Sequence, residues 1–313
     1  MLPDNDTIAI LRGDAPEAEQ LGRLTDQQLN IIRSNKWFKL FVPKDQNGLG
    51  MLLPEVLRLE ETLAWIDGSI GWVVTLCSGA GWFVGFADQN FIRPLINDSN
   101  FCVAGSGAVG VAKTEGDGFR INGSWKYASG SLHATVFTMN CVIEGTNDVR
   151  SFFLLPNEVT VKHTWNSMGM IATGSHSFEV KDQHVGIARQ FIIQPDHAVL
   201  KDDIYRYPFL QLAEITLAVN LSGMALRFIE LSGQRPDRLD HYRKIFFDAV
   251  ENNQLSKIST ASHELVNASR NIVNEIYPSL GLGAADKSTE VNRVWRNFHT
   301  AAQHSLFQKR IFR

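Results

Sequence analysis

Three glycines in the first half of the chain match a nucleotide-binding pattern by their spacing. Gly105, Gly107 and Gly110 fit the form G-x-G-x-x-G and follow the apolar residues 101–104. In a dinucleotide-binding turn these glycines open a helix, and an acidic residue about 20 positions further on holds the ribose. Residues 111–123 are too rich in glycine for that helix, and no acidic residue stands at the ribose position. We therefore expect a glycine-lined strand end, where backbone without a Cβ can approach a flat ligand closely.

The side chains that would mark metal-dependent or hydrolytic chemistry do not fall into the required patterns. The nine histidines form no H-E-x-x-H pair and no quartet with cysteine, so we expect no bound metal. No serine lies in a G-x-S-x-G turn. The adjacent acids Glu60 and Glu61 are expected at the solvated edge of a helix rather than as a catalytic carboxylate pair. These patterns argue against a metalloenzyme and against a hydrolase.

The composition is that of a globular protein without an excess of either charge. The chain has 313 residues, 44% of them hydrophobic, and its 30 basic and 33 acidic side chains give a net charge of −3. This balance lacks the positive field that a nucleic-acid partner requires. The three cysteines form no C-x-x-C pair and no basic, then apolar, leader opens the chain, so we expect a cytoplasmic protein. The uncharged stretch 70–87 approaches the length of a membrane span, but its four glycines predict a buried helix and no membrane.

Helical periodicity dominates the first hundred residues. Thr25 is followed three residues later by Gln28, which is the spacing of a capping box and predicts the start of a helix. Pro54 opens a second predicted helix. The apolar residues of this second helix recur at helical spacing: Val56, Leu59, Leu63 and Ile66. Between the two helices, residues 42–50 are rich in proline, asparagine and glycine and predict a loop.

The pattern changes near residue 101 and changes back after residue 208. Asn122-Gly123 stands between two alternating runs and predicts a tight hairpin. Further strands are expected at 134–143, 151–155, 158–163 and 176–185. Apolar residues at helical spacing return in three stretches, 217–231, 255–276 and 291–305, which predict a helical bundle. The chain is thus expected to be an α+β multidomain protein, with an N-terminal all-α domain (1–99), a central antiparallel β-barrel-like domain (100–203) and a C-terminal bundle (204–313).

Four regions of the chain resemble one protein family, in the correct order. They are VPKDQNGLG with residues 55–72, GDGFRINGSWKYASGSLHAT (116–135), TWNSMGMIATGS (164–175) and NRVWRNFHTAAQH (292–304). On these regions the chain resembles the acyl-CoA dehydrogenase superfamily over nearly its whole length. The local motifs look like those of its flavin-dependent monooxygenase branch, the two-component, group D type.

The resemblance implies that FAD or FMN lies between the central strands and the bundle. Ser129 matches a hydroxyl that bonds near flavin N5, where it can stabilise developing negative charge. Tyr127 matches an aromatic residue beside the ring. The other positions carried over to cofactor contact are Gly105 and Ser106 at the pyrimidine edge, and Trp165, Thr173 and Ser175 on another side of the ring.

The resemblance also implies a catalytic pair and a reaction. His304 matches a histidine that points from the last long helix toward flavin and substrate, where an imidazole can move a proton. With Ser129 it would serve a reaction in which reduced flavin and O₂ oxygenate a small aromatic or heterocyclic substrate. Trp72, Trp82 and Phe83 are expected to supply an apolar pocket. A separate flavin reductase and a homo-oligomer, a dimer or tetramer, are further expectations from the family.

Two alternatives stay open. The first is an FAD-dependent acyl-CoA dehydrogenase with Glu214 as base, although residues 295–313 lack the acidic residue that this branch commonly has there. The second is a non-catalytic homologue that acts as a partner subunit. It is considered because the bundle is shorter than in the family, around residues 232–248. For the arginine that would hold the flavin diphosphate, the sequence offers only Arg235 and Arg238 as candidates.

Overall fold

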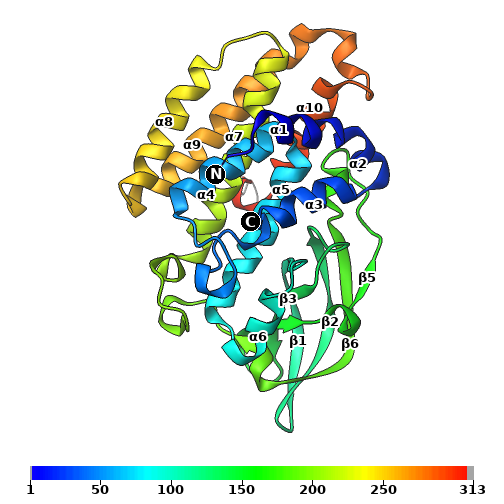
Figure 1. Ribbon diagram of the computed structural model, residues 1–313, viewed down its shortest axis with the longest axis vertical. Helices are drawn as coiled ribbons and strands as arrows, with labels where there is room; N and C mark the ends of the chain where they lie inside the picture. Colours follow the sequence, from blue (N-terminus) through cyan, green and yellow to red (C-terminus); the bar gives the residue numbers. More distant parts are fainter. Residues whose placement is uncertain (1, 309–313) are drawn as a thin grey trace.

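The computed structural model describes residues 2–308, which form N-terminal helices, a seven-stranded sheet and a helical bundle (Figure 1). The N-terminal helices are α1 (Asn5–Gly13), α2 (Ala15–Leu21), α3 (Asp26–Ser34), α4 (Leu53–Ile66), α5 (Gly68–Gly81) and α6 (Gln89–Ile96). The strands are β1 (Val103–Glu115), β2 (Gly118–Ala128), β3 (Val136–Ile143), β4 (Val149–Leu154), β5 (Thr160–Lys162), β6 (His176–Gly186) and β7 (Gln190–Phe191). The bundle consists of α7 (Phe209–Leu231), α8 (Asp237–Glu251), α9 (Leu255–Ile276) and α10 (Glu290–Ala301). The predicted fold class is confirmed, whereas the division at residues 99 and 203 stays a prediction.

The helix starts predicted from local signals are confirmed. Thr25 Oγ1 accepts the backbone N–H of Gln28 over 3.1 Å, and the Gln28 side chain accepts the N–H of Thr25 over 3.0 Å. In α4, Pro54 lies in the first turn and the predicted apolar stripe is buried. Asp67 then caps α5, because its Oδ1 accepts the N–H groups of the first turn.

Two apolar segments, Gly68–Phe86 and Phe209–Leu231, are long enough to cross a membrane, and 89% and 72% of their apolar windows are buried inside the protein. The first covers residues 70–86 of the stretch predicted as a buried helix, and its burial confirms that prediction. It consists of α5 followed by a 3₁₀ turn, Trp82–Phe86.

The prediction of a hairpin at Asn122-Gly123 is wrong. Strand β2 runs straight through these two residues, because it is paired with β1 on one side and with β6 on the other. The pairing with β6 shifts register at this point, and Asn122 Oδ1 accepts the N–H of Asp182 over 2.8 Å. The turn between β1 and β2 lies instead at Gly116 and Asp117, where Gly116 adopts a φ of +57°.

The sheet has the order β5-β6-β2-β1-β3-β4-β7 and is antiparallel except for one pair. Strands β1 and β3 are parallel, with Val103 opposite Val136, so the expectation of a wholly antiparallel sheet needs this correction. The remaining strands appear close to their predicted ranges. The Gly105–Gly110 segment lies inside β1, as expected for a strand rather than a nucleotide-binding turn.

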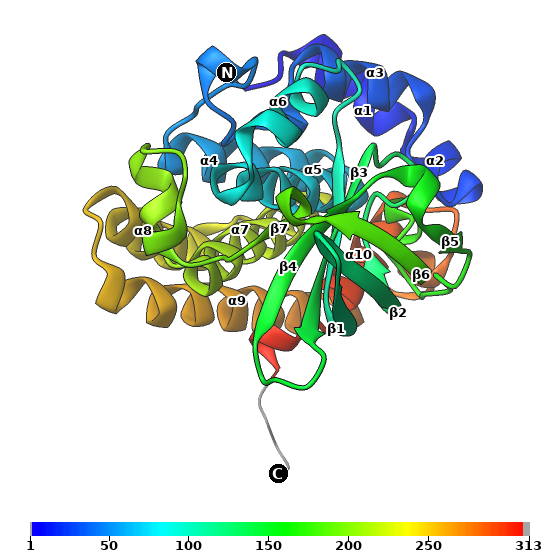
Figure 2. The same ribbon diagram turned by 90° about the horizontal axis from the view of Figure 1, so that it is seen from below.

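The bundle contains one helix that the periodicity did not reveal and one that is shorter than expected. Helix α8 fills much of the region 232–248, where the sequence analysis predicted no helix and only a shortening of the bundle. Helix α10 ends at Ala301, so Ser305 lies outside it. Helix α7 packs on α4 and α9, and α5 contacts α7 as well as β1 (Figure 2). Because α5 joins the bundle to the sheet, a residue on α5 can contact both.

Candidate functional site

Three buried hydroxyl groups form a connected row where the sheet meets α5. Ser129 follows β2, whereas Thr173 and Ser175 precede β6. Ser129 Oγ lies 2.8 Å from Ser175 Oγ, which lies 2.7 Å from Thr173 Oγ1. Thr173 Oγ1 donates to the carbonyl oxygen of Met170 over 2.7 Å. We call Ser129, Ser175 and Thr173 the hydroxyl row.

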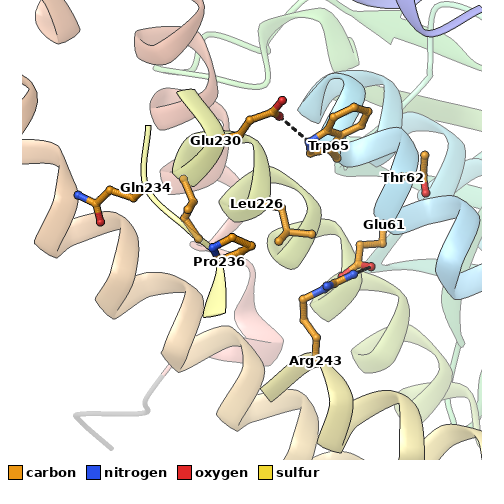
Figure 3. Close-up of a pocket in the computed structure, with 9 residues that line it drawn as sticks. Glu61, Thr62, Trp65, Leu226, Glu230, Gln234, Pro236 and Arg243 are labelled. Carbon is orange, nitrogen blue, oxygen red and sulfur yellow. Dashed lines mark hydrogen bonds and ion pairs between the residues drawn. The ribbon is translucent and has the colours of Figure 1, made fainter. Parts of the chain in front are cut away.

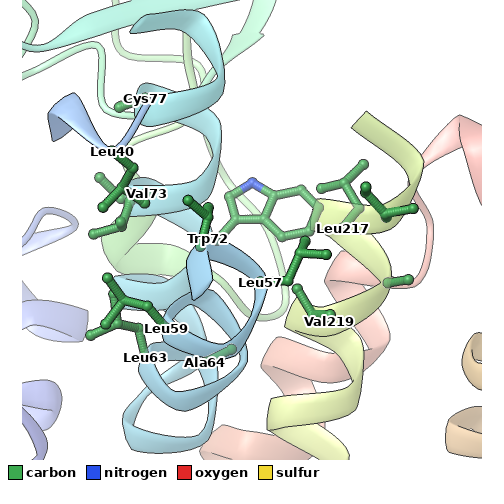
Figure 4. Packing of buried hydrophobic residues seen from close by; sticks show 14 of the residues in the cluster. Leu40, Leu57, Leu59, Leu63, Ala64, Trp72, Val73, Cys77, Leu217 and Val219 are labelled. Atoms are coloured by element: carbon green, nitrogen blue, oxygen red, sulfur yellow. The ribbon is translucent and has the colours of Figure 1, made fainter. Parts of the chain in front are cut away.

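Trp72 of α5 connects the hydroxyl row to His304. Its Nε1 donates to Ser129 Oγ over 3.1 Å. Its ring lies between α5 and α7, close to Leu217 (Figure 4), and meets the imidazole of His304 edge to face, with ring centroids 6.0 Å apart. The two residues predicted to be catalytic are therefore linked through a single indole. The sequence analysis predicted Trp72 only as part of an apolar pocket, because no local sequence pattern reveals its contacts with Ser129 and His304.

The two ends of the row fix the direction of its protons. An indole N–H can only donate, and a backbone carbonyl can only accept. With Trp72 donating at one end and the Met170 carbonyl accepting at the other, Ser129 donates to Ser175, and Ser175 donates to Thr173. Ser129 therefore keeps a lone pair free. It becomes the donor expected for a flavin only when its hydroxyl rotates away from Ser175.

Helix α10 holds the loop that carries Thr173 and Ser175. Asn297 Oδ1 accepts the N–H of Met170 over 2.6 Å, and Thr300 Oγ1 accepts the N–H of Gly169 over 3.0 Å. A Cβ at Gly169 would lie 2.2 Å from the backbone carbon of Arg296, so only glycine allows this approach. Sequence reasoning missed these α10 contacts because they join segments that are distant in the chain.

Tyr127 and Trp165 form an aromatic pair near the hydroxyl row. Their ring centroids lie 6.1 Å apart at 79°. Trp165 is held at two points, because its N–H donates to His176 Nδ1 over 3.0 Å and its Nε1 donates to the Met170 carbonyl over 2.9 Å. Tyr127 adopts a φ of +64° and is 70% exposed. An exposed ring in this strained backbone can pack against a planar ligand.

Gly105 and Ser106 lie in β1, opposite Thr138 and Met139 of β3. Ser106 Oγ donates to the carbonyl of Lys126 over 2.6 Å, next to Tyr127 in the chain. This bond ties the predicted pyrimidine-edge segment to the end of β2, where Tyr127 and the following Ser129 lie. All the predicted cofactor positions thus belong to adjoining segments, while their roles stay predictions.

His304 lies beyond the last helix, not on it as expected. Its Nδ1 accepts the N–H of Leu306 over 3.4 Å, which places the proton of the neutral ring on Nε2. Burial lowers the pKa of His304 below its ordinary value, so the ring is neutral at neutral pH. In this tautomer the free nitrogen is a donor. The arrangement therefore suits holding a proton near a ligand better than removing one from it.

Comparison with known proteins shows which proteins the chain is similar to. The family described as acyl-CoA dehydrogenase, C-terminal domain, matches residues 244–309. An indole-3-acetate monooxygenase from Pseudomonas putida is 26% identical over 228 residues, which are 71% of this chain and 58% of that protein. The flavin-dependent monooxygenase oxygenase subunit HsaA of Mycobacterium tuberculosis is 27% identical over 232 residues, or 69% and 58%. The crystal structure of the HsaA monooxygenase from M. tuberculosis superposes with a TM-score of 0.89 at 20% identity, over 97% of this chain and 92% of that one.

Residues 244–309 match this C-terminal family of the acyl-CoA dehydrogenase superfamily, and the whole chain has the same fold as the HsaA monooxygenase. Within the superfamily it resembles the flavin-dependent monooxygenases. The sequence alignments span 58% of the length of both of these relatives.

The residues present fit the flavin that the superfamily resemblance implies. A flavin needs hydrogen-bonding groups along one edge and an apolar face beside its ring system. The hydroxyl row supplies the first through Ser129, whose Oγ keeps a lone pair and a rotatable proton. The exposed ring of Tyr127 supplies the second. Trp72 closes the site on the side of α5.

Two of the residues that an acyl-CoA dehydrogenase or its flavin diphosphate would need, Glu214 and Arg238, already make contacts with other side chains. Glu214 of α7 accepts from Ser259 Oγ over 3.1 Å and lies 2.7 Å from His263 Nε2, so it ties α7 to α9. A base for thioester chemistry would have to give up these bonds. Arg238 pairs with Glu275 on the surface at 2.6 Å, and Arg235 is exposed. Neither arginine lies on the segments that carry the hydroxyl row.

Two other expectations about single residues are corrected. Glu60 and Glu61 are buried, not solvated. Glu61 receives two bonds from the Arg243 guanidinium, at 2.8 and 2.7 Å, beside a hollow of about 390 Å³ (Figure 3). Burial raises the pKa of Glu60 well above its ordinary value.

Trp82, which was expected to supply an apolar pocket, is a core residue. Its Nε1 donates to the Ile204 carbonyl, and its ring stacks on Phe209.

Proposed function

We propose that the chain is the oxygenase component of a two-component flavin-dependent monooxygenase that acts on a small aromatic or heterocyclic substrate. The observation that carries the proposal is the linkage of Ser129 to His304 through Trp72. The names of the relatives, an indole-3-acetate monooxygenase and a flavin-dependent oxygenase subunit, support the same reaction class.

The chain's own residues orient the reactants and manage protons. Reduced FMN or FAD, when bound, supplies the electrons with which O₂ is activated for transfer of one oxygen atom. Ser129 rotates its hydroxyl from Ser175 to donate at the reactive edge, while the Trp72 N–H continues to hold its oxygen. His304 holds a proton on Nε2 near the indole of Trp72. The buried indole and the surrounding apolar residues exclude water.

An anaerobic titration with reduced FMN and reduced FAD tests the proposal. We expect saturable binding of at least one of them, followed on mixing with O₂ by absorbance changes that depend on an aromatic substrate. Ser129→Ala should weaken the binding, whereas Thr146→Ala removes an exposed hydroxyl that bonds to the Ile143 carbonyl after β3 and should leave binding unchanged. A protein that binds neither reduced flavin would contradict the proposal and favour the non-catalytic alternative.

The partners and setting of the protein are part of the proposal. The name "oxygenase subunit" of one relative supports a separate flavin reductase. A homodimer or homotetramer follows from the superfamily resemblance, and light scattering of the purified chain measures it. A cytoplasmic location rests on the sequence argument alone and is tested by fractionation of the source cells.

A further inference from the structure

A second hollow, of about 430 Å³, lies outside the hydroxyl row, between the first helices and the start of α10. Its size is within the range of small-molecule sites, roughly 300–1,000 Å³. The residues around it are Ala9, Arg12, Gly13, Pro16, Ser288, Glu290 and Arg293. Two arginines thus face one hollow.

Arg293 is buried in the wall of this hollow without a close partner. It is only 7% exposed, and its Nε has no hydrogen-bond partner among the described residues. The carboxylate it faces is Asp67, whose Oδ2 lies 3.8 Å from Nε, too far for a hydrogen bond. A buried guanidinium with an unused N–H costs stability, and because Arg293 also lines the hollow, its positive charge favours an anion there.

Arg12 also lines this hollow and has a second unused donor. Its Nη2 is buried without a partner among the described residues. Its guanidinium carbon lies over the Trp65 ring, 4.4 Å from the centroid, and its Nε donates to the Ile66 carbonyl over 3.4 Å. The Arg12 guanidinium is therefore held in place without a ligand.

The carboxylates near these arginines are bonded elsewhere. Asp67 Oδ1 accepts two backbone N–H groups at the start of α5. Glu290 also lines the hollow, but its Oε1 accepts from Arg227 Nε over 2.7 Å and lies 3.8 Å from Arg12 Nε. The strong partner of Glu290 is thus Arg227, which leaves Arg12 and Arg293 as the incompletely satisfied cations.

We propose that this hollow binds a phosphate group between Arg12 and Arg293. Two guanidinium forks match the oxygen atoms of a phosphate, and the N-terminal end of α10 adds a favourable dipole. Ala9 and Pro16 give the hollow an apolar wall that suits the organic part of a phosphate ester. The site goes beyond the proposed monooxygenase function and requires no flavin.

Isothermal titration of the flavin-free full chain with inorganic phosphate and with phenyl phosphate, at constant ionic strength, tests the site. We expect saturable binding of both probes, weakened at least about tenfold in Arg293→Gln. Arg206→Gln replaces an exposed arginine outside the hollow and should bind as the native chain does. Tighter binding of phenyl phosphate would identify an ester as the ligand, and equal affinities would identify free phosphate.

Arg12→Gln is the second variant, because Arg293→Gln removes the charge that faces Asp67 and could unfold the chain. Arg12→Gln should also lose affinity while circular dichroism shows a folded protein. The site is refuted when the native chain gives no saturable heat with either probe, or when the folded variants bind as tightly as the native chain. This outcome leaves the monooxygenase proposal unaffected, because the titration contains no flavin.

Discussion

The imidazole of His304 lies against the edge of the Trp72 indole, with ring centroids 6.0 Å apart and the planes at 63°. The same indole donates its N–H to Ser129. A movement of Trp72 therefore changes the surroundings of both residues at once. This relationship makes Trp72 a positioning residue for the site, although its side chain carries no group that titrates.

Replacing Trp72 by phenylalanine keeps an aromatic ring and removes the N–H donor. Ser129 Oγ then loses its fixed donor in a buried place, which costs about 1–3 kcal/mol of unfolding free energy. Trp65→Phe is the control, because the N–H of Trp65 donates to Glu230 at an exposed site. Urea unfolding measures both variants. Equal losses of stability would show that the Trp72 N–H has no special role.

Ser175→Ala interrupts the hydroxyl row at its middle. Ser129 then has no hydroxyl acceptor among residues 2–308, and Thr173 loses its donor. We expect the affinity for reduced flavin to fall about tenfold, as for the loss of one buried hydrogen bond. Thr164→Ala removes a hydroxyl that pairs with Ser177 outside the row and should not alter this affinity. Unchanged flavin affinity in Ser175→Ala would separate the row from the cofactor.

The partly buried His133 makes the protein sensitive to acid. Burial, with the nearby charges of Arg23 and Arg33, lowers the pKa of His133 to about 4. The unfolded chain binds this proton near pH 6.5, so stability is complete above that pH and declines as the pH falls toward 4. The loss attributable to His133 is about 3 kcal/mol at most.

Urea unfolding at pH 7 and pH 4.5 tests this expectation with His133→Gln. The variant should lose less stability on acidification than the native chain does. His197→Gln replaces an exposed histidine and should follow the native chain. Burial also lowers the pKa values of His176, His299 and His304, so some acid sensitivity remains in every variant. Identical acid losses in the native chain and His133→Gln would refute the assignment.

Local signals predicted the helices well because the groups that fix them are close in sequence. The capping box of Thr25 and Gln28 is complete within four residues. The Asn122-Gly123 signal failed because two neighbouring strands, not the local backbone preference, determine the path of β2. The burial of Glu61 was missed for the same reason, since its partner Arg243 comes from another helix.

The candidate site divides in a similar way. The resemblance supplied the residues of the hydroxyl row, but not the direction of its protons, which depends on Trp72 and the Met170 carbonyl. The position of His304 beyond α10 depends on where that helix ends. Both properties arise from contacts between α5, the loop before β6 and the C-terminal segment, and no periodicity in the sequence encodes them.

Gly169→Ala tests whether α10 positions the loop of the hydroxyl row. The new Cβ would meet the backbone of Arg296 at 2.2 Å, so the loop must move away from α10. The bonds from Met170 to Asn297 and from Gly169 to Thr300 then lengthen or break. We expect a loss of about 1–3 kcal/mol in unfolding free energy, as for an overpacked contact. Reduced flavin should bind more weakly, because Thr173 and Ser175 move with the loop.

Gly107→Ala is the matched control for this substitution. A Cβ at Gly107 meets no atom within 4 Å, although the residue belongs to the glycine-rich run of β1. The free energy of unfolding of Gly107→Ala should stay within about 0.5 kcal/mol of that of the native chain, as for an unconstrained surface position. If Gly169→Ala lost stability and kept full flavin affinity, α10 would support the fold without positioning the site. If both affinity and stability fell only in Gly169→Ala, the approach of α10 to this loop would be what holds the hydroxyl row in place for the cofactor.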